Sequence, residues 1–127
     1  MKKRIFELNI LEIVIFLIIG IFFENFFEIS QVNGISMEPT LQDGDYIITL
    51  HGLFPTDGDI IIVNTENNKY YDCNRIVKRY IAEKSDENNI WVEGDNVDVS
   101  LDSRITGTLE RKDIIGVVIL DINKIFR

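Results

Sequence analysis

Short β-rich runs set between turn residues fill most of the chain after residue 29. Two of the turns read Asp-Gly-Asp, at positions 43–45 and 57–59, and each leads into an apolar run, residues 45–49 and 59–63. Such a turn before a β-branched run is typical of a tight turn that enters a strand. The same character recurs in residues 69–71, 75–82, 90–93 and 114–120. With no long helical pattern here, the sequence predicts a mainly β domain, an antiparallel barrel or sandwich.

The N-terminal segment has a different composition from the β-rich body. Lys2, Lys3 and Arg4 open the chain, and residues 13–23 form an uncharged apolar stretch of eleven residues. A membrane-spanning helix needs about 20 mostly apolar residues, so it would have to include Glu12 at a cost in free energy. The stretch is apolar on every side, whereas a core helix carries one apolar stripe.

Three interpretations of this segment compete: a cleaved signal peptide, a buried core helix and an uncleaved membrane anchor. A signal peptide needs a small-residue cleavage site, and the only alanine of the chain is Ala82. We favour a single transmembrane helix within residues 1–28, with the basic tip in the cytoplasm by the positive-inside rule. Residues 29–127 would then form an extracytoplasmic β-rich domain beside the lipid bilayer of the cell membrane.

Charge and cysteine content exclude several classes of protein. The net charge of −8 argues against a nucleic-acid binder, which needs a basic face to neutralise phosphates. A lone cysteine, Cys73, cannot form an internal disulfide. As a catalytic thiol it would need a histidine, and nothing in the sequence connects it to the only one, His51. We therefore interpret Cys73 as structural and His51 as a surface-loop residue, and we expect no metal and no cofactor.

A serine lies in an unusual turn at residues 34–41, which read Gly-Ile-Ser-Met-Glu-Pro-Thr-Leu. Pro39 biases Glu38 away from the helical region, so Ser36 is expected on turned or extended backbone. Such a turn can expose a hydroxyl and direct backbone N–H groups at a nearby oxyanion. Taken alone, the segment fits an ordinary turn serine equally well.

A nucleophilic serine needs a base, and a lysine is the strongest candidate. Lysine serves as a base only when neutral, and burial lowers its ordinary pKa of about 10.4 by disfavouring the charged form. Lys78 shares one face of the run 75–82 with Ile76 and Tyr80 by the period of two. From this strand alone, a lysine that extends to water is the simpler interpretation.

A third polar segment begins with Gly94-Asp95-Asn96 and continues to Gly107. Asp102 and Arg104 are two residues apart, close enough for a local ion pair. Ser100 could offer its hydroxyl to a neighbouring amine. A solvated loop is the alternative interpretation.

Together these segments resemble bacterial type I signal peptidases, serine proteases with a Ser–Lys dyad. That family carries a G-x-S-M-x-P-T-L box, two Gly-Asp boxes before strands, a strand with Lys-Arg, and a G-D-N…S-x-D-S-R…G box. The matching positions occur in the family's order after a hydrophobic segment and cover nearly the whole chain: residues 34–41, 44–45, 58–59, 78–79 and 94–107.

The resemblance implies a membrane-anchored serine endopeptidase that removes signal peptides from exported preproteins, after small residues at −1 and −3. Ser36 would be the nucleophile and neutral Lys78 its general base. The Ser36 N–H would bind the oxyanion, and Ser100 would orient the lysine amine. The residues implied as structural support are Met37, Pro39, Asp95, Asn96, Asp102 and Arg104.

Three departures from the family pattern concern the substrate side more than the dyad. Gly34 stands where some members carry a hydroxyl, Val97 stands where arginine is common, and residues 81–87 replace a Gly-Leu-Pro-Gly-Asp-like turn. Two alternatives stay open. One is a relative of the LexA-like self-cleaving repressors, although the chain has no room for their DNA-binding domain. The other is a catalytically silent membrane protein with the same fold.

Overall fold

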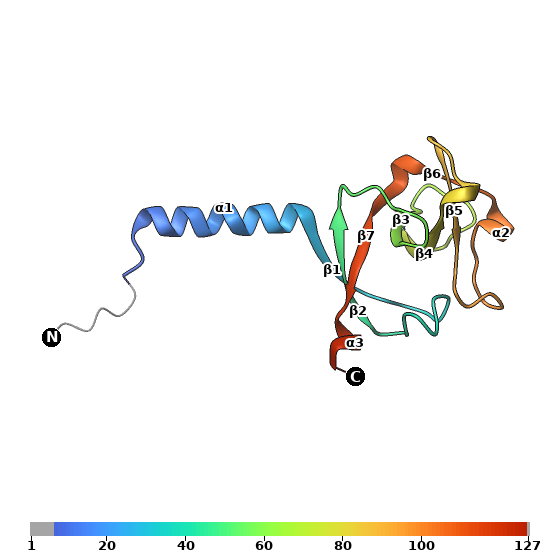
Figure 1. The fold of residues 1–127 in the computed structure, drawn as a ribbon, viewed down its shortest axis with the longest axis horizontal. Helices are drawn as coiled ribbons and strands as arrows, with labels where there is room; N and C mark the ends of the chain where they lie inside the picture. The colour runs from blue at the N-terminus through green and yellow to red at the C-terminus, as the bar shows by residue number, and fades with distance from the viewer. Residues whose placement is uncertain (1–6, 127) are drawn as a thin grey trace.

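A long helix, α1 (Ile10–Phe26), extends from a β-rich domain in the computed structural model, which describes residues 7–126 (Figure 1). The basic tip at residues 2–4 lies outside the described residues. The remaining elements are β1 (Phe27–Gln31), β2 (Tyr46–His51), β3 (Ile60–Asn64), β4 (Arg75–Ile81), η1 (Ala82–Lys84), β5 (Asn89–Glu93), α2 (Ser103–Thr106), β6 (Leu109–Glu110), η2 (Arg111–Asp113), β7 (Ile114–Asp121) and α3 (Ile122–Phe126).

Five of the six predicted strands are present, as β2, β3, β4, β5 and β7. The prediction for residues 69–71 is wrong, because this stretch belongs to a turn in which the Tyr70 N–H donates to Asn68 Oδ1 at 2.9 Å. The strands β1 and β6 were missed. β1 starts directly where α1 ends, with no turn residue between them, and β6 is only two residues long.

All strand pairs are antiparallel and form one sheet in the order β1-β2-β7-β3-β4-β5-β6. The mainly β antiparallel fold is therefore confirmed. The edge strands β1 and β6 do not pair with each other in the described part of the chain, so the sheet is open. We expected a barrel or a sandwich, and the barrel is not closed.

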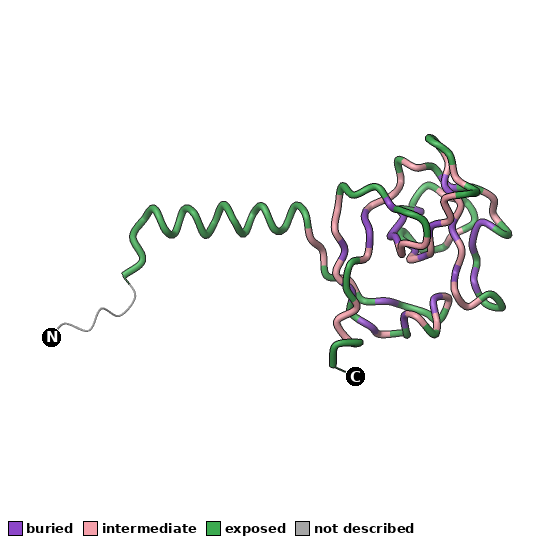
Figure 2. The backbone as a smooth tube through the Cα atoms, viewed as in Figure 1, coloured by how far each residue is buried: buried purple, intermediate pink, exposed green. Residues whose placement is uncertain are grey.

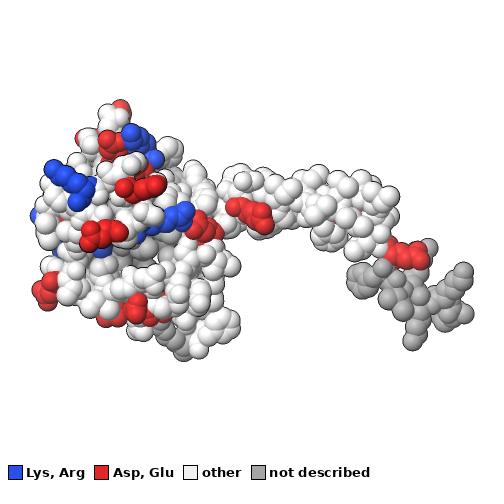
Figure 3. Space-filling model, turned by 180° about the vertical axis from the view of Figure 1, so that it is seen from behind, with Lys and Arg blue, Asp and Glu red and all other residues white. Residues whose placement is uncertain are grey.

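The helix α1 is 17 residues long and has no buried residue (Figure 2). Its start is fixed by a capping box, in which Asn9 and Glu12 exchange side-chain and backbone hydrogen bonds. Its end is fixed because Phe27 already pairs with Leu50 of β2. Figure 3 shows an uncharged surface along most of this helix, with acidic residues toward its two ends. Within residues 7–126, no helix has both the length and the apolar character needed to cross a membrane, contrary to our expectation.

The core of the β domain lies on both faces of the sheet. Alternate residues of β3 point to opposite sides, so Ile61 and Val63 join one apolar cluster and Ile62 joins another. The second cluster also takes in Met37 and Leu41 from the long connection between β1 and β2. This connection is therefore attached to the sheet by buried side chains at two points.

Candidate active site

The turn that carries Ser36 is anchored on both sides. Next to the serine, Met37 is 1% exposed and packs in the second core cluster with Leu41. On the other side, Gly34 has φ of 96°, which favours glycine, and its N–H donates to Asp43 Oδ1 at 2.7 Å. The structural support expected from Met37 stays a prediction.

Backbone N–H groups at the turn are free to bind an anion. The Glu38 N–H donates to the Ile35 carbonyl at 3.2 Å, and the Glu38–Pro39 peptide bond is cis. The N–H groups of Ser36 and Met37 donate to no acceptor in the part of the chain that the structure describes. These are the donors that an oxyanion beside Ser36 could use.

The loop after β5 holds the Ser36 turn from the opposite side. Asn96 donates from its backbone N–H to the Ser36 carbonyl at 2.9 Å and from Nδ2 to the Ile35 carbonyl at 3.0 Å. Gly94 approaches so closely that a Cβ there would lie 2.5 Å from Ser100 Cβ and 2.7 Å from the Ser36 carbonyl oxygen. Glycine at position 94 is thus required by packing against the turn.

A second connection, which the sequence analysis missed, joins the same turn to β4. Arg79 donates from Nε and Nη2 to the two carboxylate oxygens of Asp95 at 2.8 and 2.6 Å. Thr40 donates to Asp95 Oδ2 at 2.5 Å. The hydrogen bonds from Arg79 lower the pKa of Asp95, and the single hydrogen bond from Thr40 lowers it further, whereas burial opposes both. Asp95 therefore stays ionised and holds the two segments together.

Lys78 is buried on β4, with only 5% of its surface exposed. Ile76 and Tyr80 are buried on the same face, as the period of two predicts. The alternative of a lysine that extends to water is therefore wrong. Burial lowers the pKa of Lys78, an effect opposed by the charge of Asp102 and reinforced by that of Arg104. Its amine has no hydrogen bond or ion pair within residues 7–126.

The predicted ion pair between Asp102 and Arg104 is present, with Nη2 and Oδ2 2.5 Å apart. Asp102 is fully buried and also accepts from the Gly94 N–H at 2.8 Å and from Ser100 Oγ at 2.6 Å. Burial alone would raise the pKa of Asp102, but the hydrogen bonds from Arg104, Gly94 and Ser100 outweigh it and hold the pKa far below its usual value. The residue is a fixed negative charge under the site.

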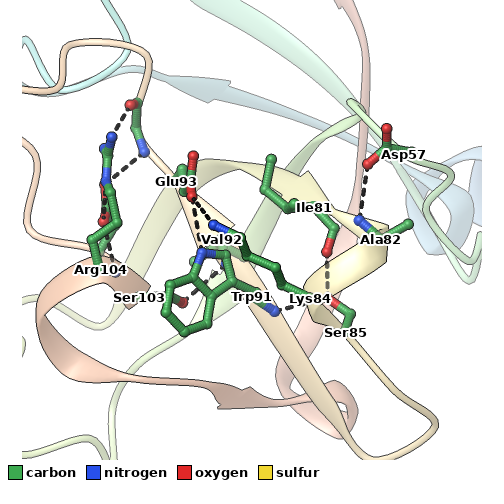
Figure 4. Close-up of polar contacts among 12 residues, drawn as sticks. Asp57, Ile81, Ala82, Lys84, Ser85, Trp91, Val92, Glu93, Ser103 and Arg104 are labelled. Atoms are coloured by element: carbon green, nitrogen blue, oxygen red, sulfur yellow. Dashed lines mark hydrogen bonds and ion pairs between the residues drawn. The ribbon is translucent and has the colours of Figure 1, made fainter.

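Neighbouring contacts fix the position of this network on the sheet. Arg104 Nη2 also donates to the Gly94 carbonyl at 3.0 Å. Figure 4 shows Ser103 next to β5, where its buried hydroxyl accepts the Val92 N–H at 2.9 Å. The expected contact of Ser100 with the Lys78 amine does not occur among the described hydrogen bonds; the Ser100 hydroxyl donates to Asp102 instead. An orienting role for Ser100 stays a prediction.

Ser36 and Lys78 line one cavity of about 640 Å³. Its walls come from residues 30–37, from 70–73 and 75–78, and from a few apolar side chains of other elements. The two side chains make no hydrogen bond with each other within residues 7–126, and hydrogen bonds between catalytic groups are often long in structures without substrate.

His51 and Cys73 differ from their predicted positions. His51 ends strand β2 instead of lying in a surface loop, and its Nε2 is 3.0 Å from Glu28 Oε2. It is not among the residues that line the cavity. Cys73 is exposed and does line it, so this residue is not a buried structural cysteine.

Comparison with known proteins identifies the family. Residues 5–87 and 83–122 match the family described as signal peptidase, peptidase S26. The chain is also similar to the mitochondrial inner membrane protease subunit 1 of Schizosaccharomyces pombe, with 31% identity over 103 residues that cover 66% of each protein. It thus spans about two thirds of the length of this curated relative. The chain belongs to the signal peptidase family, as its motifs indicated.

Proposed function

We propose that this protein is a serine endopeptidase that removes signal peptides from preproteins, with Ser36 as nucleophile and Lys78 as general base. The observation that supports this most strongly is the position of the Lys78 amine. Lys78 is only 5% exposed, its amine has no hydrogen bond or ion pair within the described residues, and it lines the same cavity as Ser36. Burial of an amine disfavours its charged form, so the amine loses its proton more readily and can then accept one from serine.

In the proposed reaction, neutral Lys78 takes the proton of Ser36 Oγ as that oxygen attacks the scissile carbonyl carbon. The negative charge that develops on the carbonyl oxygen is stabilised by the free N–H groups of Ser36 and Met37. Lys78 then gives its proton to the leaving amine, and a water molecule hydrolyses the acyl–serine ester with Lys78 again as base. Asp102 and Arg104 keep the amine's surroundings fixed throughout.

The edge of β4 supports a substrate that binds as an extended strand. β4 pairs with β3 from Arg75 to Arg79 but with β5 only from Arg79 onward. On the side away from β3, the backbone between residues 75 and 78 therefore has no strand partner in the described part of the chain, and these residues line the cavity. A preprotein segment can add to such a free edge through main-chain hydrogen bonds, which places a peptide bond beside Ser36.

The helix α1 supports membrane association. Its apolar side chains are exposed on all sides, and the similar yeast protein is named as an inner membrane protease. We propose that residues 1–28 attach the protein to a lipid bilayer and that residues 29–127 form the catalytic domain on the extracytoplasmic side. A catalytically silent role would require an exposed, charged Lys78, and its 5% exposure argues against that alternative.

The direct test is purified protein in detergent with a model preprotein that carries alanine at positions −1 and −3 of its cleavage site. We expect one cut after the −1 residue, measured by mass spectrometry. Cleavage should increase with pH as Lys78 loses its proton, and this limb should lie below the ordinary lysine pKa of 10.5 because burial lowers the pKa. A preprotein with a bulky −1 residue is the control. Equal cleavage of both, or no cleavage of either, would reject the proposal.

A further inference from the structure

The only cysteine of the chain faces the proposed active site. Cys73 lies between β3 and β4, is exposed, and lines the 640 Å³ cavity together with Ser36 and Lys78. The cavity has the size of a small-molecule site. A group attached to this sulfur would therefore occupy the space that a substrate needs.

The backbone around this cysteine is held in place. Thr65 donates from Oγ1 to the Cys73 carbonyl at 2.6 Å and from its N–H to the Asn74 carbonyl at 2.8 Å. Thr65 is itself 1% exposed, so the anchor is part of the core. The backbone that carries Cys73 is thus fixed at the wall of the cavity.

One polar group near this cysteine lacks a partner within residues 7–126. Lys78 lines the same cavity, is only 5% exposed, and its amine makes no hydrogen bond or ion pair in that range of the chain. Tyr71 lines the cavity as well, with its hydroxyl buried near the Thr106 side chain. Buried polar groups without partners favour a ligand that can satisfy them. A polar adduct on Cys73 would be within the same enclosure.

We propose that Cys73 is a modification site for small disulfides and that its adduct closes the active-site cavity; the effect on cleavage rests on the proposed function. The Cys73 thiolate attacks one sulfur of a disulfide R–S–S–R. The new bond is Cys73–S–S–R, the old S–S bond breaks, and R–S⁻ leaves with the electron pair. The proton of the thiol passes to solvent, and the disulfide is the only oxidant required.

The test uses the full chain in detergent and two thiol-specific methanethiosulfonate reagents, one that adds a methylthio group and one that adds a bulky biotin group. Mass spectrometry should show a single adduct in the wild type and none in Cys73→Ser, because the chain has one cysteine. Each chain is compared with its own unlabelled sample. We expect the bulky adduct to lower preprotein cleavage more than about tenfold, the methylthio adduct to lower it less, and dithiothreitol to restore it.

Two outcomes would overturn the inference: complete bulky labelling without loss of cleavage, or no labelling of the folded chain. If the unlabelled wild type does not cleave, the protease proposal fails, and accessibility then decides the inference. Labelling of Cys73 that is slowed by excess preprotein supports a shared cavity, whereas an unchanged labelling rate rejects it. Cys73→Ser, treated in the same way, shows whether any loss of cleavage comes from another site.

Discussion

Ser36→Ala is expected to abolish cleavage of the model preprotein, with a loss in kcat on the order of 10⁶-fold, as for other serine proteases without their nucleophile. The folded state should be unaffected, since the Ser36 hydroxyl makes no hydrogen bond within residues 7–126 and the turn is held by backbone contacts with Asn96. The measurement is single-turnover cleavage beside a thermal unfolding curve for the same preparation.

Ser85→Ala is the matched control, since it removes a hydroxyl remote from the cavity. Ser85 Oγ donates to the Ile81 carbonyl at 2.7 Å and accepts the Trp91 N–H at 2.8 Å (Figure 4). This variant should lose about 1 kcal/mol of stability and keep its cleavage activity. Ser36→Ala should show the opposite signature. Cleavage by Ser36→Ala at the wild-type rate would exclude Ser36 as the nucleophile.

Lys78→Met is expected to lower cleavage by about 10²–10⁴-fold, the usual contribution of a general base. Methionine fills a similar volume without an amine, so the buried face of β4 keeps its packing. Because the folded pKa of Lys78 is lowered, the folded chain holds this proton less tightly than the unfolded chain, and the resulting loss of stability develops as the pH falls from 10.5 through the folded pKa. At neutral pH the wild type is therefore destabilised by this group, and Lys78→Met should melt at the same or a higher temperature.

Lys84→Met is the control for a lysine that lies outside the cavity. Lys84 is half exposed, 3.4 Å from Glu93 and 5.1 Å from the centre of the Trp91 ring. Its loss should change stability by less than about 1 kcal/mol and leave cleavage intact. If Lys78→Met cleaves as fast as Lys84→Met, another group must be the base.

Local patterns in the sequence were sufficient for most strands and for the face of β4. The alternation of Ile76, Lys78 and Tyr80 depends only on the period of two, and the three residues share one face of β4 as expected. The ion pair of Asp102 with Arg104 spans two residues and was equally predictable. The burial of Lys78 was not predictable, because it depends on which distant segments of the chain cover the strand.

Contacts between distant segments could not be read from the sequence. Thr40 and Asp95 are 55 residues apart, and Asn96 and Ile35 are 61 apart, yet these pairs fix the Ser36 turn. The Lys-Arg pair could have indicated one of these contacts. Arg79 follows Lys78 directly on the strand, so its side chain lies on the opposite face and needs an acidic partner on that face. The hydrogen bond of Ser100 depends on how Asp102 is placed beneath the loop, which no spacing rule gives.

The bounds of α1 depend both on local contacts and on contacts between distant segments. The capping box at Asn9 and Glu12 is local and could have been predicted from the sequence. The end of the helix is set by the pairing of Phe27 with Leu50, 23 positions further along the chain, so the apolar composition alone gave too long a helix.

The proton affinity of one side chain decides whether a serine at position 36 has a base. An NMR pH titration of the Lys78 amine, in Ser36→Ala protein with ¹⁵N-labelled lysine and with Lys78→Met for assignment, measures it directly. We predict a pKa below 10.5 that matches the pH limb of cleavage. A Lys78 amine that titrates at or above 10.5 would contradict this account.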